Sequence, residues 1–168
     1  MLISEGYRDQ QTTMHENPAY GTASIEYAPS VTAIVNTLKI TDLLDYGAGK
    51  GRLAQSLRPD HDLSIRMYEP SVEEWADTPE PTEMVCCIDV LEHVEPECLD
   101  DVIADLRRVT LKYGFFTVHT GAARKTLPDG RNAHLTQEDY RWWLPKLWER
   151  FFIQSIGHTK KGFYLVVN

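Results

Sequence analysis

Cysteine is scarce in this sequence, with three residues among 168, at positions 86, 87 and 98. An odd number of cysteines without C-x-x-C spacing indicates neither a disulfide framework nor a cysteine-based zinc site. Cys86 and Cys87 are adjacent in an apolar run, and successive side chains of a strand point to opposite faces, so we expect both to be small buried side chains. Free thiols of this kind suit a reducing compartment, and the sequence predicts a cytoplasmic protein.

Long apolar runs and an excess of basic charge are also missing. No run approaches the ~20 apolar residues that cross a bilayer, and the N-terminus lacks the basic and apolar segments of a secretory signal. Asp and Glu outnumber Lys and Arg by 25 to 17, giving a formal net charge of −8. This balance argues against broad electrostatic binding to nucleic acid or an anionic membrane. The length suits one domain over residues 1–168, with a polar, unpatterned and therefore flexible arm at residues 1–13.

The sequence does contain a glycine-rich turn that follows an apolar run. Gly47, Gly49 and Gly51 alternate with other residues directly after Leu43-Leu44-Asp45-Tyr46. This order predicts a buried strand, a tight turn and the first turn of a helix, whose free N–H groups face a ligand. In the dinucleotide-binding order G-x-G-x-x-G the third glycine would stand at position 52, where this chain has Arg52. The turn therefore favours a different class of cofactor.

Two further predicted strands end in acidic residues. Glu69 follows the run 63–68 and stands about 20 residues after Gly47, the offset at which an acidic residue meets a cofactor ribose. A carboxylate there can accept hydrogen bonds from both ribose hydroxyls. The apolar run 84–88 then leads into Asp89-Val90-Leu91-Glu92-His93. Open α/β sheets bind ligands at the carboxyl edge of their strands, so these residues fall where a ligand is expected.

Together these segments carry a resemblance to a known family. The order acidic-x-G-x-G-x-G at residues 45–51 resembles motif I of the class I S-adenosylmethionine-dependent methyltransferases. The segment 89–93 resembles the Asp/Glu-x-Leu-Glu-His segment that follows the fourth strand in many of these enzymes. The resemblance runs from about Tyr20 to the end of the chain, and similar short methyltransferases occur in phages and bacteria.

The resemblance implies a fold, a cofactor and a set of binding residues. The fold would be α/β and Rossmann-like, a mostly parallel sheet with helices on both faces and a C-terminal antiparallel hairpin at 151–156 and 163–167. The cofactor would be S-adenosylmethionine, and the partner a small or medium polar acceptor, with O-methylation as one reaction. The cofactor-binding residues would be Asp45, Gly47, Ala48, Gly49, Gly51, Glu69 and Asp89.

Other segments give the remaining elements. Residues 71–81 carry Pro79 and Pro81 and leave no room for a full third strand, which predicts a trimmed sheet edge. Apolar spacing predicts helices over 31–38, starting at Pro29-Ser30, and from Pro96 onward. A capping box at Thr136 and Asp139 predicts a helix from Tyr140, kinked or split by Pro145.

Catalytic candidates follow the strands. His93 is the candidate general base, because the pKa of histidine lies near working pH, and Glu92 stands beside it. A structural histidine that holds a loop is the alternative. His119 ends the strand 113–120, and the polar loop 121–134 brings Arg131 and His134. Long loops of this kind are often functional, so we expect this one to close over the acceptor, with His119, Arg131 and His134 as substrate contacts.

Three alternatives stay open at this stage. Asp89, Glu92 and His93, joined by His119 or His134, offer oxygen and nitrogen ligands for a metal, although we assign no metal ion here. The chain could also hold the cofactor without catalysis, or cleave it. Tyr20 and Tyr27 either face a substrate or pack in the core, and packing is favoured.

Overall fold

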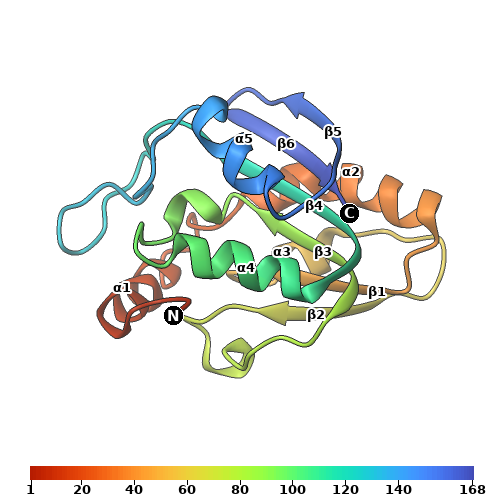
Figure 1. Cartoon of the computed structure of the whole chain (residues 1–168). Helices are drawn as coiled ribbons and strands as arrows, with labels where there is room; N and C mark the ends of the chain where they lie inside the picture. Colours follow the sequence, from red (N-terminus) through yellow and green to blue (C-terminus); the bar gives the residue numbers. More distant parts are fainter.

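The computed structural model describes residues 1–168, which form one six-stranded sheet flanked by helices (Figure 1). The strands are β1 (Asp42–Tyr46), β2 (Ser64–Tyr68), β3 (Thr82–Ile88), β4 (Thr110–His119), β5 (Ile153–His158) and β6 (Gly162–Val167). The α-helices are α1 (Glu5–His15), α2 (Ala23–Leu38), α3 (Arg52–Ser56), α4 (Leu99–Val109) and α5 (Tyr140–Trp148). Two short 3₁₀ helices are η1 (Glu73–Trp75) and η2 (Leu91–His93).

The sheet confirms the predicted Rossmann-like topology. Its strand order is β2-β1-β3-β4-β6-β5. β1 pairs in parallel with β2 and β3, β3 pairs in parallel with β4, and β6 runs antiparallel to both β4 and β5. Between β2 and β3 the chain forms η1 in place of a strand, so β2 is the edge of the sheet and the trimmed edge is confirmed.

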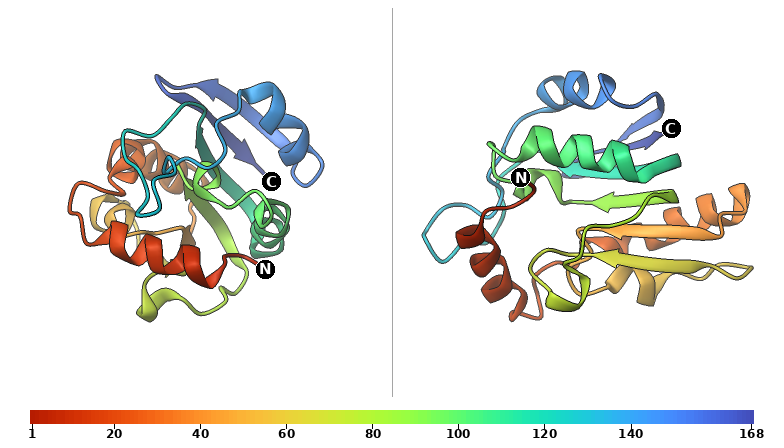
Figure 2. Two further views of the ribbon diagram at one scale, coloured as in Figure 1. Left: turned by 90° about the vertical axis from the view of Figure 1, so that its left-hand side faces the viewer. Right: turned by 60° about the horizontal axis from the view of Figure 1, so that its bottom comes forward.

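Alternating strand residues face two separate cores, one on each side of the sheet. Leu44 and Cys87 point to the side covered by α4 and α5, where Trp143 is fully buried. Leu43 and Cys86 point to the opposite side, under α2 and α3. The adjacent cysteines therefore lie on opposite faces, as the period of two in a strand requires, and all three cysteines are buried and free. Figure 2 shows the helices on the two faces of the sheet.

Two local predictions were wrong, and a third was only partly right. The expected flexible arm at residues 1–13 instead contains α1, which begins at Glu5 after the N-cap Ser4. The helix predicted from Pro29-Ser30 starts earlier, at Ala23, and contains Pro29. The helix predicted from Tyr140 is present as α5, capped by Asp139, whose side chain accepts from two backbone N–H groups. It contains Pro145 and is not split there.

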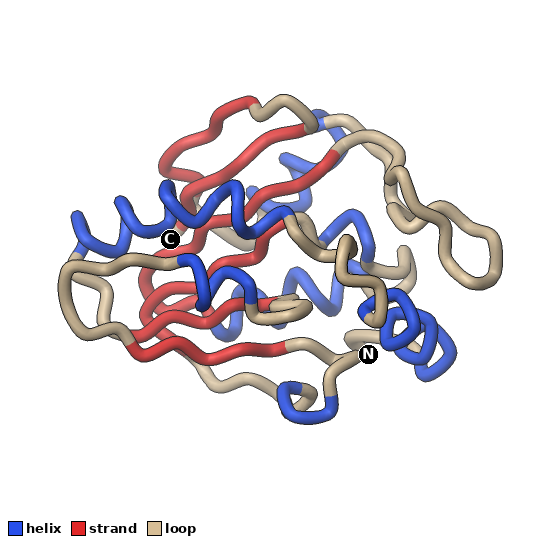
Figure 3. The backbone as a smooth tube through the Cα atoms, turned by 180° about the vertical axis from the view of Figure 1, so that it is seen from behind, coloured by secondary structure: helices blue, strands red, loops and turns tan.

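Several segments meet at the edge where β1, β2, β3 and β4 end. Both α1 and the loop that follows β4 lie at this edge, seen from the front in Figure 1 and from behind in Figure 3. None of the helices combines the length and the apolar character needed to cross a membrane.

Candidate active site

The carboxyl edge of the sheet holds a cavity of about 650 Å³. Its volume falls within the ~300–1,000 Å³ that is usual for small-molecule sites. The lining comes from α1, the start of α2, the turn after β1, the segments that follow β2 and β3, and the loop after β4. Most of the residues singled out in the sequence line this cavity: Asp45, Gly47, Ala48, Gly49, Glu69, Asp89, His93, His119 and His134.

The glycine turn presents bare backbone to the cavity. Gly47 has a φ of +76°, and a Cβ there would lie 2.4 Å from a methyl group of Val90. Its N–H donates to the Tyr68 carbonyl at 2.8 Å, which ties the turn to the end of β2. Only glycine combines this left-handed backbone with so close a neighbour. The backbone conformation and the close packing of Val90 therefore both require glycine at position 47.

Gly51 has a different role from the one implied by the resemblance. It does not line the cavity, and it stands at the N-cap of α3 with a φ of +65°. A Cβ at this position would lie 2.8 Å from the sulfur of Met67, on the far side of the turn from the cavity lining. The third glycine thus shapes the turn, and Gly47, Ala48 and Gly49 face the space.

The acidic residues at the ends of β1 and β2 reach the cavity from adjacent strands. Glu69 is held in place from two sides: Oε2 accepts from the Gly49 N–H at 3.0 Å, and Oε1 accepts from the Ser71 hydroxyl at 2.6 Å. Asp45 is buried, and its Oδ2 has no hydrogen-bond partner. Burial, and then the nearby Glu69 carboxylate, raise the pKa of Asp45 to about 7. Asp45 is therefore a site for a donor that the protein itself does not supply.

Asp89 completes the acidic series at the end of β3. Its backbone is left-handed, with a φ of +51°. Its Oδ1 accepts from the Thr117 hydroxyl at 2.6 Å, and its own N–H donates to Thr117 in return. Left-handed backbone is uncommon for residues other than glycine, although aspartate tolerates it better than most. The strained turn and the tie to β4 fix the carboxylate at the cavity wall.

Three histidines distant in the sequence gather in one group. The ring of His134 lies 4.7 Å from that of His93 and 4.6 Å from that of His119, measured between centroids. Burial, followed by the neighbouring His134, lowers the pKa of His93 to about 3. Burial and then His134 also lower the pKa of His119. His93 therefore stays neutral at working pH and offers a ring lone pair of low basicity. The sequence-based reason for choosing His93, a pKa near working pH, does not hold in the structure.

Glu92 lies behind this group. Its side chain is fully buried and does not line the cavity, so it acts on a substrate only through its neighbours. Oε1 accepts from the backbone N–H of His119 at 3.0 Å, and Oε2 has no partner. Burial, and then Asp89, raise the pKa of Glu92 well above its ordinary value.

Helix α1 supplies a wall that the sequence reasoning missed. The Tyr7 hydroxyl donates to the His93 carbonyl at 2.6 Å, and Gln11 links Tyr7 to Tyr20 through two hydrogen bonds. His15 lies 4.0 Å from the Glu69 carboxylate. A signal for this helix was present, since Tyr7, Gln11 and Met14 follow Ser4 at helical spacing. Tyr20 itself lines the cavity as well as packing.

Some basic residues of the loop after β4 line the cavity, and others face the solvent. Arg131 does not line the cavity, because its guanidinium pairs with Asp129 at 2.7 Å on the exposed side of the loop. The structure therefore does not place Arg131 at the cavity, and a substrate contact by Arg131 stays a prediction. Lys125 lines the cavity instead, with a buried Nζ that has no hydrogen-bond partner and lies 5.4 Å from the centre of the Tyr20 ring.

Comparisons with known proteins give a match at the level of structure. No protein-family model and no curated protein sequence matches the chain. Among solved structures it is similar to an O-methyltransferase family protein from Burkholderia thailandensis, with a TM-score of 0.66 and 12% identity over 95% of this chain. The chain spans 63% of that protein.

Two further solved structures are similar over most of both chains. DhpI in complex with S-adenosylhomocysteine has a TM-score of 0.61 and 18% identity, over 99% of this chain and 98% of that one. The 1,6-didemethyltoxoflavin-N1-methyltransferase of Burkholderia thailandensis, with S-adenosylhomocysteine bound, has a TM-score of 0.62 and 16% identity, over 94% and 82%. Together with the strand order and the glycine turn, these likenesses show that the chain has the Rossmann-like fold of the class I S-adenosylmethionine-dependent methyltransferases.

Proposed function

We propose that the chain is an S-adenosylmethionine-dependent methyltransferase that acts on a hydroxyl of a small or medium polar acceptor. One observation carries the proposal: the carboxylates that end β1, β2 and β3 meet the glycine turn around a single cavity. Structures of the same fold support it, since several hold S-adenosylhomocysteine. One of them was solved in the presence of D-fucose, which supports an acceptor of small-molecule size.

The residues present fit this cofactor. Glu69 already accepts three hydrogen bonds from the protein, two at Oε1 from the N–H and hydroxyl of Ser71 and one at Oε2 from the Gly49 N–H. An sp² oxygen has two lone pairs, so Oε2 can still accept from a ribose hydroxyl. The unpartnered Oδ2 of Asp45 suits the ammonium group of the cofactor's amino acid part. Gly47, Ala48 and Gly49 leave space for close approach of the ligand, and Asp89 adds a third acceptor.

The histidine group and Lys125 fit the acceptor. Bound S-adenosylmethionine would supply an electrophilic methyl group on a sulfonium, so the protein's main tasks are to orient the acceptor and to exclude water. His93 is placed to accept the acceptor's hydroxyl proton as the new carbon–oxygen bond forms, and His119 and His134 line the same wall. Lys125 and Arg124 make this end of the cavity cationic, which suits an acceptor that carries a carboxylate or phosphate.

We expect the affinity for S-adenosylhomocysteine to fall as pH drops through 7. The ligand's ammonium prefers the ionised form of Asp45, whose pKa is about 7. A single group with this pKa makes binding about 10-fold weaker at pH 6 than at pH 8. Calorimetric titrations at the two pH values check this, with Asp45→Asn as the control that should remove the dependence. Equal affinity of the wild-type protein at both values would contradict the role of Asp45.

We expect Lys125→Met to raise the KM for an anionic acceptor at least about 10-fold, with unchanged affinity for S-adenosylhomocysteine. The substitution keeps the apolar stem and removes a charge-assisted bond, which is worth roughly 1.5–3 kcal/mol. Arg131→Ala in the same loop is the matched control and should leave KM unchanged, because Arg131 is paired with Asp129. A larger effect of Arg131→Ala than of Lys125→Met would restore the substrate contact predicted from the sequence.

The acceptor itself can be found directly. The protein is incubated with S-adenosylmethionine carrying an isotopic methyl label and with a metabolite extract, and labelled products are identified by mass spectrometry. The proposal requires a labelled product that appears only with active protein and whose label sits on oxygen.

A further inference from the structure

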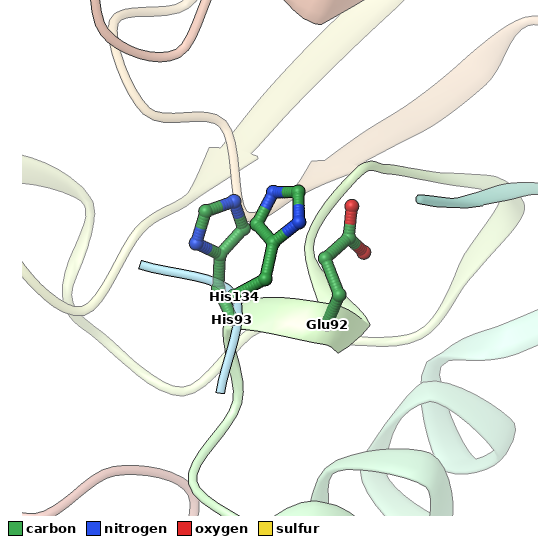
Figure 4. A group of neighbouring side chains, drawn as sticks. All are labelled: Glu92, His93 and His134. Carbon is green, nitrogen blue, oxygen red and sulfur yellow. The ribbon is translucent and has the colours of Figure 1, made fainter. Parts of the chain in front are cut away.

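Side chains from two distant segments bring possible metal-ligand atoms close together. Glu92 and His93 belong to η2, and His134 lies in the loop after β4. One ligand atom from each of the three lies within 4.8 Å of the others. Figure 4 shows the Glu92 carboxylate and the two imidazole rings extending from the backbone to the same side.

Backbone hydrogen bonds fix which ring nitrogen is free in the two histidines. Nδ1 of His93 lies 2.7 Å from the Ala133 carbonyl, and Nδ1 of His134 lies 2.6 Å from the Gly121 carbonyl. A carbonyl oxygen only accepts, so each ring must donate from Nδ1. In the neutral ring the lone pair is then on Nε2. This is the arrangement that orients metal-bound histidines, in which the second nitrogen donates to a carbonyl or carboxylate.

Glu92 brings a carboxylate oxygen that lacks a partner. The side chain is fully buried; Oε1 accepts from the His119 N–H, and no donor of the protein reaches Oε2. A buried acceptor left unsatisfied costs roughly 1–3 kcal/mol, and more when it is charged. Oε2 thus points to a cation or a proton that the protein chain does not itself provide.

We propose that Glu92, His93 and His134 bind one divalent transition-metal ion, with Zn²⁺ as the best fit. Two imidazoles and one carboxylate form the protein ligand set of some catalytic zinc sites. Ligand atoms about 2.1 Å from a tetrahedral ion are about 3.4 Å apart, so small rotations of the three side chains close the site. This replaces the expectation of no metal. Asp89 is outside the set, because its carboxylate is bonded to Thr117.

The site has an open side toward the cavity. His93 and His134 line the cavity, whereas Glu92 approaches from within the protein. The fourth coordination position therefore faces the space assigned to the acceptor and suits a water molecule or an acceptor oxygen. When the metal is bound, His93 is a ligand through Nε2 and cannot also accept the acceptor's proton, so the proton-acceptor role of His93 applies to the metal-free protein. The site does not depend on the proposed function, since metal uptake is measured without cofactor or acceptor.

Zinc titration of the chelator-treated protein tests the site. Calorimetry should show one Zn²⁺ per chain, and Co²⁺ should give the visible absorption of a low-symmetry site. Loss of an outer-shell partner already weakens metal binding about 10–100-fold, so Glu92→Gln and His134→Ala should each weaken Zn²⁺ binding at least about 100-fold. His158→Ala, on the exposed part of β5, is the matched control and should bind as the wild type does.

Either of two titration results would overturn the site: no uptake of Zn²⁺ by the wild-type protein at millimolar metal, or unchanged affinity in both variants. If the wild-type protein takes up no Zn²⁺, Glu92 Oε2 carries a proton in place of the metal ion. X-ray absorption of the zinc-loaded wild type keeps the test independent of how the variants fold, and it should show two imidazole ligands at about 2.0–2.1 Å. A spectrum without imidazole ligands would also exclude the site. Titration with S-adenosylhomocysteine on the same sample separates failure of this site from failure of the proposed function.

Discussion

In the metal-free protein, His93→Ala is expected to lower the turnover of methyl transfer by ~10²–10⁴, the range usual for loss of a positioned proton acceptor. Affinity for S-adenosylhomocysteine should stay within a few-fold, because the hydrogen bond and ring contacts of His93 go to Ala133, Tyr20 and His134 and not to the glycine turn. The pKa of His93 is lowered to about 3, so the ring is neutral above about pH 4. The factor by which His93→Ala lowers turnover should therefore be the same across neutral pH. The pH–rate profile of the wild-type protein should show no decrease on the acid side that is due to His93.

Single-turnover kinetics and calorimetry on His93→Ala, with His158→Ala as the control, separate catalysis from binding. Loss of cofactor binding in His93→Ala would place the residue in the cofactor site and contradict its catalytic role. A wild-type protein that methylates no acceptor would favour a non-catalytic cofactor-binding module. Consumption of S-adenosylmethionine without a methylated product would favour cleavage.

Glu69→Gln is expected to weaken S-adenosylhomocysteine binding about 10- to 150-fold. The charged acceptor of the ribose hydroxyls is lost, and hydrogen bonds to charged groups are worth roughly 1.5–3 kcal/mol. The glutamine keeps the volume and one oxygen, which can still accept from Gly49 or from Ser71. The effect should therefore appear in ligand affinity more than in stability.

Calorimetric titration of Glu69→Gln checks this, and thermal unfolding shows whether the fold is kept. Glu73→Gln serves as the control, since Glu73 is exposed on η1 and does not line the cavity. If Glu69→Gln binds as tightly as Glu73→Gln, the ribose does not lie against Glu69 and the cofactor is oriented differently from the proposal.

The parts of the fold that the sequence predicted are those with strong local signals. The runs at Asp45, Glu69 and Asp89 became β1, β2 and β3. β1 and β3 are mostly buried and leave a largely apolar pattern, whereas β2 is an edge strand in which Ser64 and Arg66 alternate with apolar residues. The order of strand, glycine turn and helix also predicted that Gly47 and Gly49 lie at the cavity. A turn that directly follows a strand lies at the edge of the sheet, where ligands bind.

The parts that the sequence missed depend on contacts between distant segments. Helix α1 is polar and is held by hydrogen bonds to the rest of the site, such as that from Tyr7 to the His93 carbonyl, so its apolar pattern is weak. Arg131 pairs within its own loop, and no local pattern distinguishes it from Lys125. The meeting of His134 with Glu92 and His93 depends on the path of the loop after β4, which periodicity does not encode.

The most direct test of the central claim is to measure which cofactor the protein binds, S-adenosylhomocysteine or NADH. The proposed function predicts that the wild-type protein binds S-adenosylhomocysteine in a calorimetric titration and that NADH gives no comparable heat. The displaced third glycine and the unpartnered Asp45 both favour the former ligand. Tighter binding of NADH than of S-adenosylhomocysteine would contradict the methyltransferase function.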